Sequence, residues 1–322
     1  MGRLGLLRKY IVIVLLLVSG AGVAQTDLPY TLQRGDVTLH GSLMMPKRAK
    51  KQLPIVVLHA GSGPTDRNGN SVATQNNCLK QLATMLAKNG IASLRYDRRG
   101  IAESVVPDLK EENLRFETYI DDLAVVVDSL RADVRFSSII LCGHSEGALI
   151  TLAVAAQKND IAGYISLAGC GETADHVLKE QLSGRLSSKE QQRVFAMLDS
   201  LVAGDSVRVV PKQYASLFRP SVQPYLKSWF RYNPQTLIAR LHIPILIAQG
   251  GTDKQVAERH ALLLQQAAPT ATYVFIPSMN HVLKDCTPDN FDNQRRTYTD
   301  PTFPLNKQLV KAIVRLVKQV EK

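Results

Sequence analysis

The sequence predicts an α/β domain built on a mostly parallel β-sheet, with an antiparallel hairpin at its leading edge and helices on both faces. Short strand-like runs alternate with segments of helical periodicity along most of the chain. The runs are apolar throughout rather than alternating, which is typical of parallel strands covered on both faces. A length of 322 residues suffices for one large domain with an insertion.

The first residues do not belong to this pattern. Residues 1–24 combine three basic residues, the apolar run YIVIVLLLV and small residues that end at Ala24. This layout is typical of a secretory signal peptide, and the apolar run is short for a membrane span. We therefore expect cleavage after Ala24 and a periplasmic or secreted protein without a stable membrane anchor.

The expected elements follow in order. Residues 30–46 alternate apolar and polar positions around Arg34-Gly35-Asp36, which predicts the hairpin. Parallel strands are then expected at 54–60, 91–97, 138–143, 163–169, 244–250 and 272–277. The helices with the clearest periodicity are expected at 72–89, 114–130 and 305–320.

One segment interrupts the alternation of strands and helices. Residues 171–239 contain no convincing strand, and apolar residues repeat at helical spacing from Val194 to Val202. The segment then becomes rich in aromatic residues and is broken by prolines. We predict a helical cap at 171–239, inserted into a core formed by 25–170 and 240–322.

A serine motif ends the strand at 138–143. Gly143-His144-Ser145-Glu146-Gly147 lies between a strand and a helix, which is the context of a nucleophile elbow. The flanking glycines permit a tight turn that exposes the serine hydroxyl at the carboxyl edge of the sheet. The alternative is a glycine-flanked turn in which the serine only caps a helix.

A serine hydroxyl needs a base, and His281 is the best placed of the seven histidines. It follows the last predicted strand in PSMNHVLK, where a loop can carry its ring over Ser145. His59 ends another strand and is a candidate for the pocket wall. The ring of His144 is expected to point away from the site, because this residue adjoins the serine.

The third member of such a triad is a carboxylate that orients the histidine. Asp253 ends a predicted strand in ILIAQGGTDKQV, and the order Ser145, Asp253, His281 is that of a known hydrolase arrangement. Glu172 and Asp175, which follow an earlier strand, are the alternatives.

The oxyanion hole is expected to use two backbone N–H groups. One belongs to Glu146, and the other to Ser62 in the glycine-rich loop GSGPTDRNGN, with Gly63 as the alternative. Two cap aromatics, Tyr225 and Trp229, either wall the substrate pocket or pack within the cap.

The turn RYDRRGIAES also carries charged residues. Asp97 lies beside Arg98 and Arg99 in this turn and is expected to form a salt bridge with one of them.

Five stretches together resemble the α/β-hydrolase superfamily: VVLHAGSGPTDRNGN, LRYDRRGIAES, LCGHSEGAL, ILIAQGGTDKQV and PSMNHVLK. The nearest resemblance is to exported bacterial esterases of the serine-aminopeptidase-like branch, which carry a helical cap. It implies a triad of Ser145, Asp253 and His281, with oxyanion positions at Ser62 and Glu146. Two departures concern loop packing: Ala102 and Ala60 stand where relatives have glycine.

These observations lead us to expect a serine hydrolase that cleaves small-molecule carboxylic esters through an acyl-enzyme. No metal or cofactor is implied. A serine aminopeptidase or amidase is the alternative enzyme, and it would need an acidic pocket for the substrate amine. A non-catalytic binding protein of the same fold is the alternative from another class.

The net charge and the cysteine content say less about function than these motifs do. The net charge is +11, but the basic cluster KRAKK at 47–51 has no interleaved aromatics, so no nucleic-acid partner is expected. Of the four cysteines, Cys78 and Cys286 either pair or stay free; the spacing does not distinguish these states.

Overall fold

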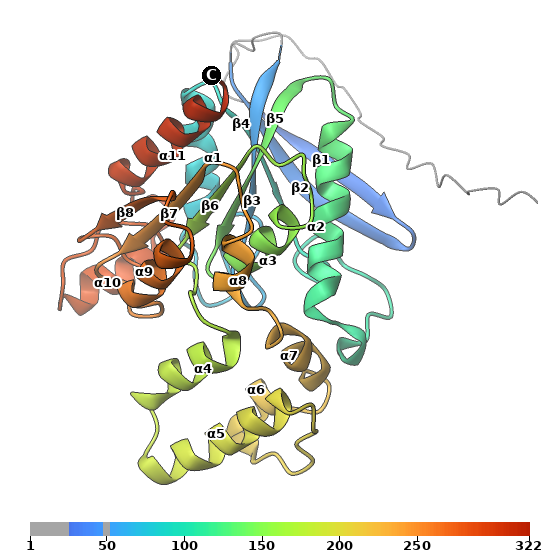
Figure 1. Cartoon of the computed structure of the whole chain (residues 1–322), viewed down its shortest axis with the longest axis vertical. Helices are drawn as coiled ribbons and strands as arrows, with labels where there is room; N and C mark the ends of the chain where they lie inside the picture. The colour runs from blue at the N-terminus through green and yellow to red at the C-terminus, as the bar shows by residue number, and fades with distance from the viewer. Residues whose placement is uncertain (1–25, 48–51) are drawn as a thin grey trace, which may run out of the picture.

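The computed structural model describes residues 26–47 and 52–322. The predicted signal peptide at 1–24 and residues 48–51 of the basic cluster lie outside the described residues. The central sheet has the order β1-β2-β4-β3-β5-β6-β7-β8 (Figure 1). Its strands are β1 (Thr26–Arg34), β2 (Val37–Met45), β3 (Leu53–His59), β4 (Ala92–Tyr96), β5 (Phe136–His144), β6 (Gly163–Leu167), β7 (Ile245–Gly250) and β8 (Thr272–Ile276).

The sheet is parallel except at its leading edge. β1 and β2 form an antiparallel hairpin that closes at Arg34 and Val37, and β2 also runs antiparallel to β4. The remaining neighbours pair in parallel, and His59 at the end of β3 pairs with Gly143 of β5. This confirms the predicted sheet. Its carboxyl ends therefore meet at one edge, where loops from several strands come together.

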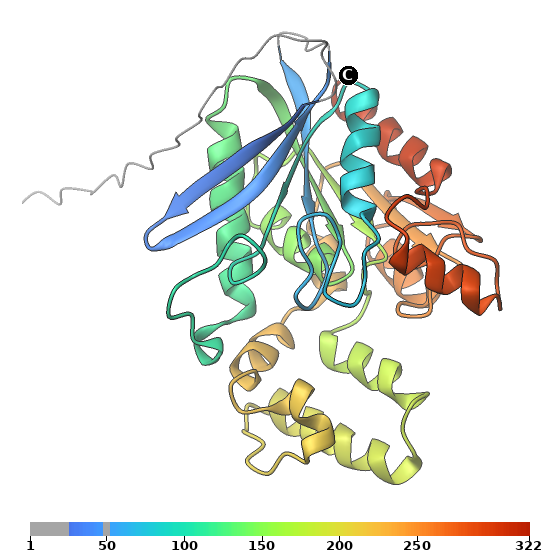
Figure 2. The ribbon, with the colours of Figure 1, turned by 180° about the vertical axis from the view of Figure 1, so that it is seen from behind.

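Helices cover both faces of the sheet. α1 (Cys78–Lys88) and α11 (Lys307–Val320) cover one face (Figure 2). The other face is covered by α2 (Phe116–Arg131), α3 (Glu146–Ala155) and α9 (Glu258–Ala267). Side chains of β3 alternate between the two layers, so Val56 packs with α1 and α11 while Val57 packs with α2 and α3. A strand buried on both sides explains the continuous apolar runs in the sequence.

Between β6 and β7 the chain forms only helices. These are α4 (Ala174–Ser183), α5 (Ser188–Val202), the 3₁₀ turn η2 (Lys212–Tyr214), α6 (Ala215–Phe218), α7 (Gln223–Trp229) and α8 (Pro234–Ile238). Helices α4 to α7 project beyond one end of the sheet (Figure 1). They enclose a small apolar core of their own, which includes Val194, Leu198 and Phe218. Ile238 of α8 instead packs into the core of the main domain.

Two connections differ from the expected elements. The helix expected from residue 72 begins at Cys78, because Asn77 has a left-handed backbone (φ 53°) and the preceding loop has its own hydrogen bonds. The sequence analysis predicts neither the 3₁₀ turn η1 (Glu111–Asn113) nor α10 (Phe291–Thr299), which lies between β8 and α11. All four cysteines are free.

Within the described ranges, no helix has both the length and the apolar character that crossing a membrane requires.

Candidate active site

The turn between β5 and α3 holds Ser145 in a strained backbone conformation. Its φ is 55° and its ψ is −123°, a combination that costs a residue with a side chain about 1–3 kcal/mol. A Cβ at Gly143 would overlap the carbonyl oxygen of Gly147, and a Cβ at Gly147 would overlap that of Ala60. Both glycines are therefore required by contact with neighbouring backbone. The Ser145 N–H donates to the carbonyl of Leu167, 2.9 Å away, which fastens the turn to β6.

Asp253 and His281 meet at the same edge of the sheet. Nδ1 of His281 donates to Oδ2 of Asp253 at 2.8 Å. The other oxygen, Oδ1, accepts the backbone N–H groups of Gln255 (2.7 Å) and Val256 (3.0 Å). Burial raises the pKa of Asp253, but His281 and these two N–H groups outweigh burial, so the pKa lies below its ordinary value. An ionised Asp253 keeps the proton of His281 on Nδ1 and leaves Nε2 to act as a base.

Ser145 and His281 line one cavity of about 200 Å³. Gly61 and Ser62 line it too, and a Cβ at Gly61 would lie 3.1 Å from the Cβ of Ser145, so this loop passes directly against the serine. Within the described residues, the Ser145 hydroxyl makes no hydrogen bond to His281. Such contacts often tighten only when substrate binds.

Of the two expected oxyanion donors, Ser62 lines this cavity and Glu146 directly follows Ser145 in the chain. Ser62 is exposed in the loop after β3. Glu146 is the first residue of α3, so its N–H has no acceptor within the helix. Both N–H groups belong to segments that touch Ser145, one through Gly61 and the other as the next residue of the chain.

The expectation for His144 is wrong, because its ring lies in the site. Nε2 of His144 lies 2.8 Å from the backbone oxygen of His281, and the two ring centroids are 4.8 Å apart. Burial lowers the pKa of His144 to about 4, so the neutral ring donates its Nε2–H to that oxygen. The loop after β8 crosses this side of the sheet edge, and alternation along β5 could not reveal that crossing.

His59 lies beneath the elbow and is not among the residues that line the serine cavity. Its Nδ1 lies 3.0 Å from the carbonyl oxygen of Ala60, and its backbone and ring pack against Gly147. Burial and the nearby charge of Arg98 lower the pKa of His59 to about 3, so this histidine is neutral.

The charged turn after β4 is paired differently from the expectation. Asp97 bonds to Arg67, at 3.0 Å from the guanidinium and 2.7 Å from the backbone nitrogen, and not to Arg98 or Arg99. Arg99 pairs with Asp122 instead. Successive side chains at a strand end point in different directions, so neighbours in sequence do not meet here.

Arg98 points toward the serine turn. Its Nη1 donates to Oε1 of Glu146 at 2.9 Å, and its Nη2 donates to the carbonyl oxygen of Gly63 at 2.5 Å. The side chains of Arg98 and Glu146 are each only 4% exposed. This pair is not predicted from the sequence, because it joins residues 48 positions apart and has no local signal.

A second cavity, of about 410 Å³, reaches the other part of the oxyanion loop at Gly63. Tyr225 of α7 lines this cavity, and its hydroxyl donates to Oε1 of Glu146 at 3.0 Å. Trp229 lines neither cavity; it stacks on Phe116 of α2 with ring centroids 6.0 Å apart. The two cap aromatics therefore differ, since one faces a cavity and the other packs between cap and core.

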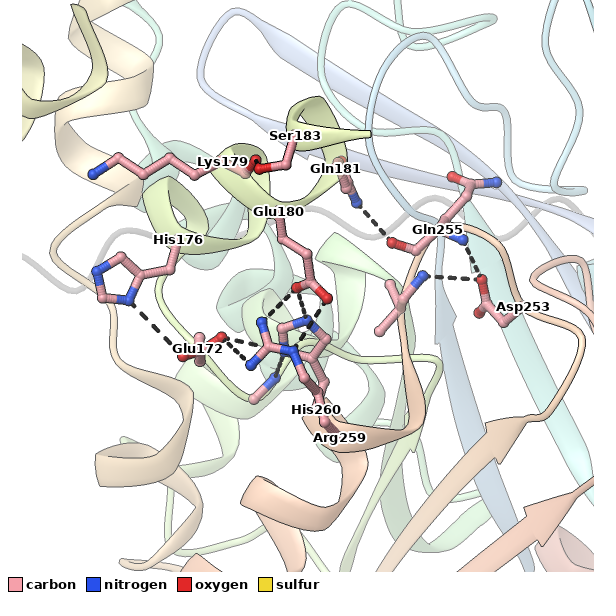
Figure 3. Close-up of polar contacts among 12 residues, drawn as sticks. Glu172, His176, Lys179, Glu180, Gln181, Ser183, Asp253, Gln255, Arg259 and His260 are labelled. Carbon is pink, nitrogen blue, oxygen red and sulfur yellow. Dashed lines mark hydrogen bonds and ion pairs between the residues drawn. The ribbon is translucent and has the colours of Figure 1, made fainter. Parts of the chain in front are cut away.

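The alternative acids Glu172 and Asp175 have other partners than His281, and Figure 3 shows Glu172 beside Arg259. Glu172 and Glu180 both pair with Arg259, at 2.7 and 2.5 Å, and Asp175 lies 3.6 Å from Nε2 of its neighbour His176.

Glu172, Glu180 and His260 also lie close enough together to hold a metal ion. The guanidinium of Arg259 bonds both carboxylates, however, and so supplies the positive charge that a cation would bring. His260 is already bonded through Nε2 to Glu180 at 2.7 Å. This geometry favours an ion-pair cluster between α4 and α9 over a metal centre.

Solved structures share this architecture. Est1E from Butyrivibrio proteoclasticus superposes with a TM-score of 0.61 at 15% identity, over 92% of this chain and 100% of Est1E. A proline iminopeptidase from Mycobacterium smegmatis gives a TM-score of 0.58 at 13% identity, over 91% and 98% of the two chains. These similarities show that the chain has the α/β-hydrolase fold.

Sequence comparisons find similarity to a peptidase family and to an esterase. The family described as serine aminopeptidase, S33, matches residues 72–204, which include Ser145 but neither Asp253 nor His281. Esterase EstD from Thermotoga maritima is 28% identical over 234 residues, which cover 72% of this chain and 54% of EstD. The chain thus spans about half the length of this relative. The expected resemblance to esterases and to the aminopeptidase-like branch is confirmed.

Proposed function

We propose that this α/β-hydrolase cleaves carboxylic esters of small molecules through an acyl-enzyme formed on Ser145. The observation that carries the proposal is the 2.8 Å hydrogen bond between His281 and an ionised Asp253, beside a cavity that His281 shares with a serine held at φ 55°. The similarity to an esterase supports the same reaction class.

Each group has a defined task in this reaction. Nε2 of His281 takes the hydroxyl proton while Oγ of Ser145 attacks the ester carbonyl. The N–H groups of Ser62 and Glu146 bind the oxyanion that forms. His281 then returns the proton to the leaving alcohol. Water attacks the acyl-enzyme with His281 again as base, and the carboxylic acid departs from a regenerated serine.

Esters fit this site better than substrates with a free amine. An aminopeptidase needs an unpaired carboxylate to bind the substrate ammonium group. Glu146 is paired with Arg98, Glu172 is paired with Arg259, and Asp175 faces His176. The buried Arg98 would also repel a cation near the serine.

The two cavities give an ester two places to extend. The loop from Gly61 to Gly63 contributes to both, so groups on either side of a carbonyl at Ser145 find separate space. Leu109, Leu114 and Val222 make part of the larger cavity apolar, and we assign the acyl chain to it.

We further propose that the enzyme works outside the cytoplasm, as a periplasmic or secreted protein. The basic and apolar character of residues 1–24 supports export. The N-terminal residue of the protein recovered from culture fluid or periplasm tests this directly, and a start at Gln25 is expected.

The activity test uses p-nitrophenyl acyl esters of graded length beside aminoacyl p-nitroanilides. Ester turnover is expected, with complete loss in Ser145→Ala and in protein labelled by a fluorophosphonate probe. Ser137→Ala, an exposed serine at the opposite end of β5, is the matched control and should keep full activity. Turnover of anilides alone, or labelling at another residue, would contradict the proposal.

A further inference from the structure

Arg98 joins the two segments that supply the oxyanion hole. One of its nitrogens bonds the backbone carbonyl of Gly63, the residue after the first donor, Ser62. Another bonds the side chain of Glu146, the residue that carries the second donor. Across residues 26–47 and 52–322, no other side chain hydrogen-bonds to both segments.

The two segments need such a connection. Ser62, Gly63 and Pro64 are exposed, and Gly63 has a left-handed backbone with φ 70°, so apart from the hydrogen bonds of Thr65 to Ser62 and Gly63 little fixes this loop. An oxyanion hole works only when its donors lie 2.7–3.1 Å from the position of the developing charge. A displacement of one donor by a fraction of an ångström therefore reduces its contribution.

An arginine suits this role because its planar group donates in two fixed directions at once. The guanidinium carbon of Arg98 lies 5.0 Å from the centroid of Tyr119, which covers one face of the plane. The hydroxyl of Tyr225 bonds the same oxygen of Glu146 that Arg98 does, so the cap adds a third constraint. Burial lowers the pKa of Arg98, but Glu146 outweighs burial, so the pKa lies above its ordinary value and the group stays charged.

We propose that Arg98 is a positioning residue that sets the geometry of the oxyanion hole by tying the Ser62 loop to the start of α3. The inference rests on the proposed ester hydrolysis and adds the element that holds its two N–H donors. Arg98 touches no reacting atom in this scheme. It acts through Gly63 and Glu146.

Arg98→Lys tests the tie, because lysine keeps the charge beside Glu146 but loses the two-pronged geometry. We expect kcat to fall about 10- to 100-fold, less than the 10²- to 10³-fold cost of removing an oxyanion donor outright. KM should stay within about twofold, and affinity for an alkyl boronic acid, a transition-state analogue, should fall in parallel with kcat/KM.

Arg95→Lys is the matched control. Arg95 is a fully buried arginine of the preceding strand that pairs with Asp27 and with Asn68 at the far end of the same loop, and it bonds neither residues 61–64 nor Glu146. It should lower Tm and leave kcat unchanged. A rise of KM with constant kcat in Arg98→Lys would instead make Arg98 a substrate contact and overturn the proposal.

The double variant Arg98→Gln/Glu146→Gln separates positioning from simple charge neutralisation. Arg98→Gln alone leaves a buried carboxylate without its cation and should lower Tm. Removing both charges should bring Tm most of the way back to the wild-type value. The kcat should stay low, because the Gly63 carbonyl still lacks its hydrogen bond from Arg98. Recovery of kcat together with Tm would overturn the proposal.

Wild-type protein without esterase activity would overturn the proposed function, whereas active wild type and an unimpaired Arg98→Lys would overturn this inference alone.

Discussion

The two sides of Ser145 are held in different ways. On the acid–base side, Asp253 is fixed by backbone N–H groups two and three residues further along its own loop. On the oxyanion side, Gly63 and Glu146 are held by one guanidinium from a third segment of the chain. The first side is organised by its own loop, whereas the second depends on contacts from Arg98 and Tyr225 in distant segments, so the two should respond differently to substitution.

Asp253→Asn should give the largest effect of any change outside Ser145 and His281. The amide can donate to Nδ1 of His281, which favours the wrong tautomer, so we expect kcat to fall about 10³- to 10⁴-fold with KM nearly unchanged. Circular dichroism should show an intact fold, because the backbone N–H groups can still bond the amide oxygen.

Glu172→Gln is the control for the acid. It removes a carboxylate that pairs with Arg259 and should leave kcat within about twofold. A large loss in Glu172→Gln, with an active Asp253→Asn, would place the acid after β6.

The same contrast explains what could be predicted from the sequence. Ser145, Asp253 and His281 each follow an apolar run that ends in a tight turn, so a local pattern is enough to select them as candidates. The mostly parallel sheet with its leading hairpin could be predicted from the same alternation, whereas the order of its strands could not. The tie through Arg98 and the inward ring of His144 depend on which loops cross in space, and no local pattern records those crossings.

His144→Phe should have a smaller effect than either Asp253→Asn or Arg98→Lys. It removes the Nε2–H bond to the backbone oxygen of His281 and keeps a ring of similar shape. A hydrogen bond contributes about 1 kcal/mol net. If its loss raises the activation free energy by that amount, kcat falls about fivefold. His176→Phe, an exposed histidine of α4, should change nothing. Equal kcat in both variants would show that the catalytic loop does not depend on His144.

The cap aromatics offer a smaller and more selective test. Tyr225 lines the larger cavity whereas Trp229 packs on Phe116. Tyr225→Ala should therefore change the ratio of kcat/KM between long and short acyl esters by about threefold, or about 0.6 kcal/mol. Trp229→Ala should lower Tm and reduce kcat/KM uniformly across chain lengths. Tyr225→Phe keeps the ring and should keep the ratio. An altered ratio in Trp229→Ala alone would reverse the two assignments.

The smallest effect is expected at Ala102, in the turn that carries Arg98. Ala102 has φ 45°, a left-handed backbone that costs an L-residue about 1–2 kcal/mol and costs glycine nothing. Glycine loses about 0.5–1 kcal/mol through its greater freedom in the unfolded chain, so Ala102→Gly should stabilise the protein by about 0.5 kcal/mol.

For a chain of this size the gain corresponds to a rise in Tm of about 1 °C, which calorimetry can resolve. Asn77→Gly is the control, because Asn77 has a similar φ of 53° but asparagine tolerates this conformation better than alanine. The Tm of Asn77→Gly should rise less than the Tm of Ala102→Gly, or fall. The turn around Ala102 is closed by backbone hydrogen bonds from Ile101 to Arg98 and from Gly100 to Ser104. Relief of strain should therefore leave Arg98 in place and kcat unchanged, whereas a stabilised but slower enzyme would show that the strained turn itself helps to aim the guanidinium.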